Sequence, residues 1–123
     1  MGTWGMGIFE NDDAGEFLDK TIQGFIDQID YFLSPEILAT DGYWGNYGQG
    51  QLLPVIDITL TLCDHYRCAF PVETSRVKHW LELTLRVLDA QIDVYYPPDK
   101  AEKREVILDI FNRLLKHAAT WDN

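Results

Sequence analysis

The chain has 123 residues, of which 46% are hydrophobic and 13% aromatic, and its formal net charge at pH 7 is −10. This length fits one domain, and the hydrophobic content is too high for a disordered chain. Such an acidic surface repels phosphate groups, which argues against nucleic acid and membrane partners and favours a basic protein. No apolar run could span a bilayer and no signal peptide precedes the first helix, so we expect a cytoplasmic protein.

The first ten residues combine glycine with aromatic side chains. This composition predicts an extended arm or a short strand that lies on the core, because glycine lets the backbone approach its neighbours closely. We expect Trp4 and Phe9 to anchor the arm.

Residues 11–33 predict the first main helix. Three side chains at its start can accept hydrogen bonds from the free N–H groups of the first turn: Asn11, Asp12 and Asp13. Apolar residues then recur at steps of three and four, which is helical periodicity. The opposite side of the helix carries acidic residues: Asp19, Asp27 and Asp30. The helix is therefore amphipathic, with an acidic outer face.

The next segment predicts a short helix followed by a loop. Ser34 and Pro35 are typical of a helix start, with serine as the cap and proline in the first turn. In residues 40–51 glycine alternates with aromatic and amide side chains, which predicts a loop. Such a composition is typical of recognition loops, where rigid aromatic side chains supply contact area. The alternative is a loop whose aromatic side chains fold back onto the bundle, and the sequence leaves both open.

Residues 51–69 are apolar on most sides and predict a central helix, although the β-branched content of residues 55–62 keeps a strand as a rival. This helix would hold Cys63 and Cys68 about 140° apart around its axis. We therefore expect two buried or half-buried thiols in a reducing compartment, poorly placed for a disulfide or a shared metal ion.

Two further helices complete the predicted fold. The first covers residues 74–94, and the second follows Pro97 and Pro98, with Asp99 and Glu102 in the spacing of a capping box. Four main helices can bury their apolar stripes against one another. The sequence therefore predicts an all-α fold, a single helical domain over residues 1–123 built as a small bundle with an extended N-terminal arm.

Charge is distributed unevenly along the chain. Residues 1–64 hold eleven acidic residues and one base, Lys20, whereas the remaining residues hold nine of each sign. The first half therefore carries the whole net charge of −10. Such asymmetry indicates an interaction surface, provided that folding keeps the carboxylates together.

No motif for catalysis or for a cofactor stands out. The oxygen-rich cluster at residues 11–16 lacks the spacing of an EF-hand loop and is better explained as a helix cap. A metal-dependent or hydrolytic enzyme, our alternative function, would need several side chains to converge on one pocket. The candidates are Asp13, Asp57, Cys63, Asp64 and His65. We expect no catalytic residues, no metal site and no cofactor.

The segment 4–14 reads Trp-Gly-Met-Gly-Ile-Phe-Glu-Asn-Asp-Asp-Ala. It resembles the opening block W-G-x-G-x-F-x-N-D-D-A of a bacterial family named domain of unknown function 4259. The resemblance covers 11 of the 123 residues and does not extend to the last predicted helix. It implies a small, mostly helical, cytoplasmic bacterial protein and supplies no catalytic residues.

The leading functional hypothesis is a non-enzymatic interaction protein, for example an immunity protein that neutralises a basic toxin through an acidic face. Complementary charge would speed the encounter of the two proteins. Eight residues are the candidates for partner binding: Asp12, Asp13, Asp27, Asp30, Asp41, Tyr43, Trp44 and Tyr47. A further possibility is a homo-oligomeric structural protein whose aromatic side chains form the contact between subunits.

Overall fold

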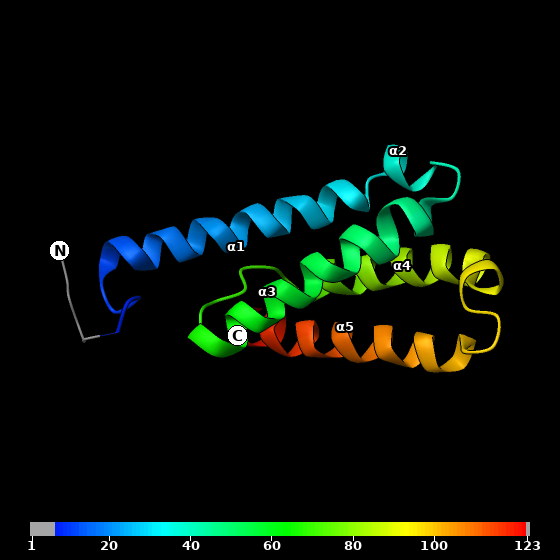
Figure 1. Ribbon diagram of the computed structural model, residues 1–123. Coiled ribbons are helices and arrows are strands. Elements are labelled where there is room, and N and C mark those ends of the chain that lie inside the picture. Colours follow the sequence, from blue (N-terminus) through cyan, green and yellow to red (C-terminus); the bar gives the residue numbers. More distant parts are fainter. Residues whose placement is uncertain (1–6, 123) are drawn as a thin grey trace.

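The computed structural model describes residues 7–122, which form helices around one hydrophobic core (Figure 1). The elements are α1 (Asp12–Phe32), α2 (Pro35–Leu38), the wide helix η1 (Trp44–Leu52), α3 (Leu53–Tyr66), α4 (Thr74–Tyr95) and α5 (Lys100–Asp122). The prediction of an all-α bundle with four main helices is confirmed. Within the described range, no helix combines the length and the apolar character needed to cross a membrane.

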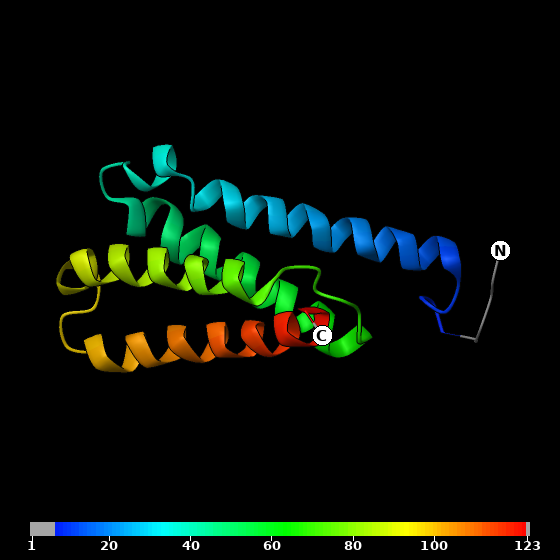
Figure 2. The ribbon, with the colours of Figure 1, turned by 180° about the vertical axis from the view of Figure 1, so that it is seen from behind.

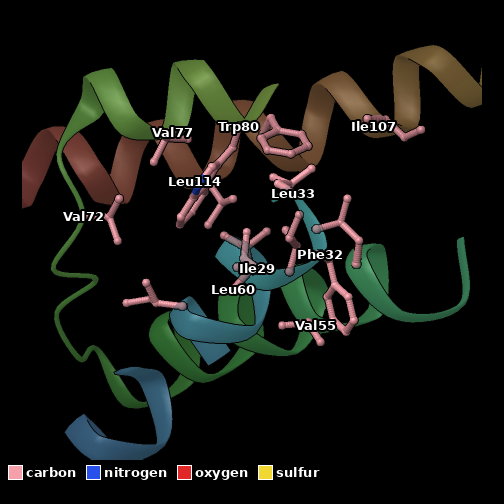
Figure 3. Packing of buried hydrophobic residues seen from close by; sticks show 14 of the residues in the cluster. Ile29, Phe32, Leu33, Val55, Leu60, Val72, Val77, Trp80, Ile107 and Leu114 are labelled. Carbon is pink, nitrogen blue, oxygen red and sulfur yellow. The ribbon is translucent and has the colours of Figure 1, made fainter. Parts of the chain in front are cut away.

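The helices pack in an antiparallel arrangement that leaves one side of α1 open. Helices α4 and α5 lie side by side along their lengths, and α3 packs against both α1 and α5. The N-terminal end of α1 projects past the ends of the other helices in both views (Figures 1 and 2). Buried side chains from α1, α3, α4 and α5 converge on a shared interior (Figure 3).

The start of helix α1 and its buried face agree with the sequence prediction. The Oδ1 atom of Asn11 accepts a hydrogen bond of 2.9 Å from the backbone N–H of Ala14, which is the expected N-cap. One face of the helix is buried in the bundle, through Leu18, Ile22, Ile26, Ile29 and Phe32. The predicted start of the short helix is confirmed, with Ser34 in the N-cap position of α2 and Pro35 in its first turn. The Ser34 hydroxyl makes no capping bond to α2, because it donates 2.8 Å back to the carbonyl oxygen of Tyr31.

The chain before α1 is described from Gly7 onwards. The backbone N–H of Glu10 donates to the carbonyl oxygen of Gly7 at 3.1 Å, so these residues form a turn. Phe9 packs edge to face on Tyr66 at the end of α3, with ring centroids 4.6 Å apart. Phe9 thus anchors this segment as expected, whereas the predicted anchor Trp4 lies outside the described residues.

The loop predicted at residues 40–51 is wrong for most of its length, because η1 is a π-type helix that begins at Trp44 and leads directly into α3. Two of its glycines mark close packing instead of a loop. A Cβ atom at Gly48 would lie 2.5 Å from the ring of Trp44, and one at Gly45 would lie 2.6 Å from the hydroxyl of Tyr95. Glycine is required here because neighbouring side chains occupy the space of a Cβ.

Helix α3 ends three residues earlier than the sequence predicts, and this changes the position of the cysteines. Arg67 adopts a left-handed conformation, with φ of 54°, and the chain leaves the helical path. Cys68 therefore turns back towards Cys63, and the two Sγ atoms lie 3.7 Å apart. The prediction that these thiols point away from each other is wrong, because it assumed a helix that continued to residue 69.

Candidate functional site

The most distinctive surface of the molecule is a line of carboxylates along the outer face of α1. We define this acidic stripe as Asp12, Glu16, Asp19, Asp27 and Asp30. Steps of three and four residues, with Gln23 filling the one gap, keep these side chains on one side of the helix. The stripe spans about 27 Å, because each helical residue rises about 1.5 Å. Asp13, in the first turn of α1, lies beside the acidic stripe and widens it at that end.

Within residues 7–122, no Lys, Arg or His comes within ion-pair distance of Glu16, Asp19 or Asp27. All three side chains are exposed, and Asp27 accepts a hydrogen bond of 3.0 Å from the amide of Gln23. Asp12 and Asp13 have a structural explanation, because acidic residues in a first turn complement the helix dipole. No such explanation applies to Glu16, Asp19 and Asp27, which lie further along the helix.

Asp30 differs from the rest of the stripe because the second half of the chain neutralises it. Its carboxylate forms an ion pair with Arg76 and accepts a hydrogen bond of 3.0 Å from the indole N–H of Trp80. The guanidinium of Arg76 also lies over the ring of Trp80, 5.4 Å from its centroid. Asp30 therefore ties α1 to α4, and its predicted role in partner binding competes with this structural role.

A surface hollow of about 370 Å³ lies beside the middle of the stripe. Its wall on α1 consists of Asp19, Lys20 and Gln23, and its opposite wall consists of Ala69, Pro71 and Trp121. The Trp121 side chain is 52% exposed. A carboxylate and an exposed indole are both groups that bind an Arg or Lys side chain, and Lys20 adds one positive charge to the α1 wall.

The position of Trp121 is fixed by its neighbour in the sequence. The carboxylate of Asp122 accepts a hydrogen bond of 2.6 Å from the backbone N–H of Thr74, the first residue of α4. Hydrogen bonding to the Thr74 side chain and then to this backbone N–H lowers the pKa of Asp122. The bond to the backbone N–H also supplies the cap that Glu73 does not provide. The end of α5 is thereby held against the start of α4, which places the indole of Trp121 at the hollow.

The aromatic residues predicted to bind a partner belong mainly to the core. Tyr43 and Trp44 are fully buried, so neither side chain offers contact surface. The Tyr43 hydroxyl donates 2.7 Å to the carbonyl oxygen of Phe32, and the Trp44 indole N–H donates 2.9 Å to the hydroxyl of Tyr96. Burial also raises the pKa of Tyr43. The sequence left open whether this segment is a recognition loop or folds back onto the bundle. In the structure, its aromatic side chains Tyr43 and Trp44 fold back onto the bundle.

The remaining two candidates lie away from the stripe. Tyr47 is half-buried and packs against Phe32 and Tyr43, with ring centroids 6.1 and 5.8 Å away. Asp41 is exposed in the connection between α2 and η1, where its backbone carbonyl accepts a hydrogen bond of 3.3 Å from Asn46. The structure therefore gathers the predicted carboxylates of α1 and separates them from the predicted aromatic residues.

The side chains required for the alternative enzyme do not converge. Asp64 meets His117 of α5 at 2.7 Å and Arg113 at 2.9 Å, and His65 packs instead on Tyr66. Hydrogen bonds from Arg113 and then His117 hold the pKa of Asp64 below its usual value. Asp57 is exposed. Among the described side chains, no three His, Cys, Asp or Glu residues gather closely enough to hold a metal ion.

Sequence reasoning did not include Glu16, Asp19 and Trp121 among the candidate residues. The spacing of the stripe could have identified Glu16 and Asp19, because 12, 16, 19, 27 and 30 follow helical steps. Trp121 carries no such signal, since its position beside α1 depends on how α5 ends. Comparisons of the chain with family models, curated proteins and solved structures found no match.

Proposed function

We propose that this protein is a non-enzymatic binding module that recognises a cationic protein through the acidic stripe of α1 and the adjoining hollow. The observation that carries this proposal is the absence of a basic counterpart, within residues 7–122, for the exposed carboxylates of Glu16, Asp19 and Asp27. An interaction of this kind needs no cofactor and no catalytic residue.

The energetics of the helix support a role outside the fold. Like charges three or four residues apart destabilise a helix by about 0.2–0.5 kcal/mol per pair. Glu16 and Asp19 form such a pair, and the nearby Lys20 makes no ion pair with either of them in the described structure. Repulsion between these two carboxylates therefore opposes helix stability in the isolated protein, and cations supplied by a partner would reduce it.

The hollow supports a specific anchor within this interface. An Arg or Lys side chain of the partner would enter between Asp19 and the exposed ring of Trp121, with the carboxylate neutralising its charge. Aromatic residues at the centre of an interface commonly carry most of the binding energy. The long stripe would steer the encounter, and the hollow would retain the partner once bound.

A basic toxin neutralised by this chain is one partner with the required chemistry. The resemblance of residues 4–14 to the bacterial family named domain of unknown function 4259 stays a prediction. The proposal predicts that the interaction weakens as salt is added. Steered association typically slows by a factor of about ten or more when ionic strength screens the charges.

The test is capture of partners from the native lysate on immobilised protein, with three matched forms compared. The double variant Asp19→Lys/Asp27→Lys reverses two charges of the stripe. The control Glu105→Lys/Asp109→Lys makes the same change in net charge on exposed positions of α5. We leave Asp30 unchanged because its ion pair with Arg76 belongs to the fold.

We expect the native chain and the α5 control to retain the same basic protein, released by salt, and the stripe variant to lose it. Trp121→Ala is expected to weaken the isolated complex by about tenfold or more, measured by calorimetry. Recovery of no basic protein, or equal loss of binding in both charge variants, would contradict the proposal.

A further inference from the structure

The two cysteines form a contact pair at the end of α3. The Sγ–H group of Cys68 points at the Sγ atom of Cys63, 3.7 Å away, and at the carbonyl oxygen of Leu62, 3.8 Å away. The left-handed residue Arg67 creates this contact, because it reverses the chain directly after the last helical turn. The two thiols therefore already face each other in the reduced protein.

The two thiols differ in their access to solvent. Cys63 is 2% exposed and belongs to the core. Cys68 is half-buried and lines a small surface hollow with Phe70, His117 and Trp121. A reagent dissolved in water can therefore reach Cys68, while Cys63 is reached through the sulfur of Cys68.

We propose that Cys63 and Cys68 are a redox-active pair that closes reversibly to an intramolecular disulfide in exchange with low-molecular-weight disulfides such as oxidised glutathione. A disulfide bond requires a sulfur–sulfur distance of about 2.05 Å, so the two atoms must approach by roughly 1.7 Å. Residues 67–73 lie outside the regular helices, which allows Cys68 to make this movement without unwinding α3 or α4.

The exchange balances in two steps. The thiolate of Cys68 attacks one sulfur of the glutathione disulfide, which forms a mixed disulfide and releases one glutathione thiolate that takes up a proton. Cys63 then loses its proton to solvent and attacks the Sγ atom of Cys68, which releases the second glutathione. The protein loses two protons and two electrons, and one glutathione disulfide takes them up to become two glutathione thiols.

The environment of the thiols indicates that this exchange is slow. Burial raises the pKa of Cys63 to about 12, with smaller contributions from Cys68 and Asp64. Burial also raises the pKa of Cys68, and the Asp19 carboxylate adds to this effect. Because the thiolate is the attacking species, we expect equilibration over minutes to hours, which suits a pair that follows the redox state of its compartment.

The disulfide would join the last turn of α3 to the segment that leads into α4. That segment packs into the core through Phe70 and Val72, and it supplies one wall of the hollow beside α1 through Ala69 and Pro71. Oxidation would therefore restrict this wall. The proposal does not depend on what the acidic stripe binds.

The test follows the full chain in buffers of reduced and oxidised glutathione, with thiols then blocked by N-ethylmaleimide in denaturant and the mass measured. We expect conversion from a form with two blocked thiols to an unblocked monomer about 2 Da lighter than the reduced chain. The thermal midpoint should rise by roughly 5 °C on oxidation, because the cross-link restricts the unfolded chain.

Two variants separate the roles of the sulfurs. Cys63→Ala should stop at a stable mixed disulfide on Cys68, and Cys68→Ser should leave the buried Cys63 unmodified under native conditions. The native chain decides the outcome even if a variant does not fold. Accumulation of its mixed disulfide, a disulfide-linked dimer, or two thiols that remain blockable after oxidation would each overturn the proposal.

Discussion

The outer face of α1 and the aromatic segment 40–51 were both candidates for recognition, and the structure places Glu16, Asp19 and Asp27 of the first and Tyr43 and Trp44 of the second in opposite environments. The carboxylates Glu16, Asp19 and Asp27 remain exposed to water, whereas Tyr43 and Trp44 are fully buried. Residue type therefore determines exposure to solvent more strongly for the carboxylates than for the aromatic side chains. A carboxylate cannot be buried without a partner, but an aromatic side chain is stable in either place once its polar atom is bonded.

The same contrast applies to the glycines of the two segments. Gly48 of η1 lies against the ring of Trp44. At Gly24 of α1, no atom other than its chain neighbours and the nearby backbone of its own helix lies within 4 Å of the place where a Cβ would be. One glycine is a packing requirement and the other is not. Three substitutions test this difference between a packed and an open segment.

The largest effect is expected for Trp44→Ala. Removing a fully buried indole leaves a cavity and breaks the hydrogen bond to Tyr96, so we expect a loss of about 3–5 kcal/mol in the free energy of unfolding. Urea denaturation monitored by circular dichroism measures this loss. Trp121→Ala is the control, and at its exposed position a change within about 0.5 kcal/mol is expected. Equal stability of the two variants would show that η1 is not part of the core.

A smaller effect is expected for Gly48→Ala. The added Cβ would lie 2.5 Å from a buried ring that has no room to move, so overpacking should cost about 1–3 kcal/mol. Gly50→Ala is the matched control in the same helix, because nothing lies within 4 Å of its Cβ position. If thermal unfolding showed the same midpoint for both variants, close packing would not explain the glycine at position 48.

The smallest effect is a gain in stability from Gly24→Ala. Gly24 is exposed to solvent and lies in the middle of the length of α1. At such a position alanine is favoured over glycine by about 0.5–1 kcal/mol. We expect a higher urea midpoint with an unchanged dependence on denaturant. A lower midpoint would mean that another part of the molecule covers Gly24 and that this side of α1 is packed.

Local patterns predicted most of the helices because each signal acts within one or two turns. The cap at Asn11 and the apolar periodicity that follows it define α1, and residues 74–94 predict α4 to within one residue at its end. Residues 40–51 failed because glycine signals a loop when judged locally, while here it serves contacts with Trp44 and Tyr95. Such contacts depend on segments far apart in the sequence.

The candidate site was predicted only in part, because local patterns do not show contacts between distant segments of the chain. Helical spacing alone places the carboxylates of α1 on one face, but it does not show that Arg76 neutralises Asp30 from α4. Trp121 lines the hollow beside the stripe at the end of α5, which the hydrogen bond between Asp122 and Thr74 holds against α4. Each of these relations joins residues more than forty positions apart.

By itself, the sequence determined that this protein is an acidic bundle of helices with its negative charge concentrated in the first half of the chain. Periodicity, capping and charge act over a few residues, so they can be deduced from the order of residue types. The tertiary structure alone decided which aromatic residues are core, which carboxylates form ion pairs with residues of other helices, and that Cys63 and Cys68 touch. These outcomes depend on one backbone turn at Arg67 and on packing between distant helices, which no local pattern encodes.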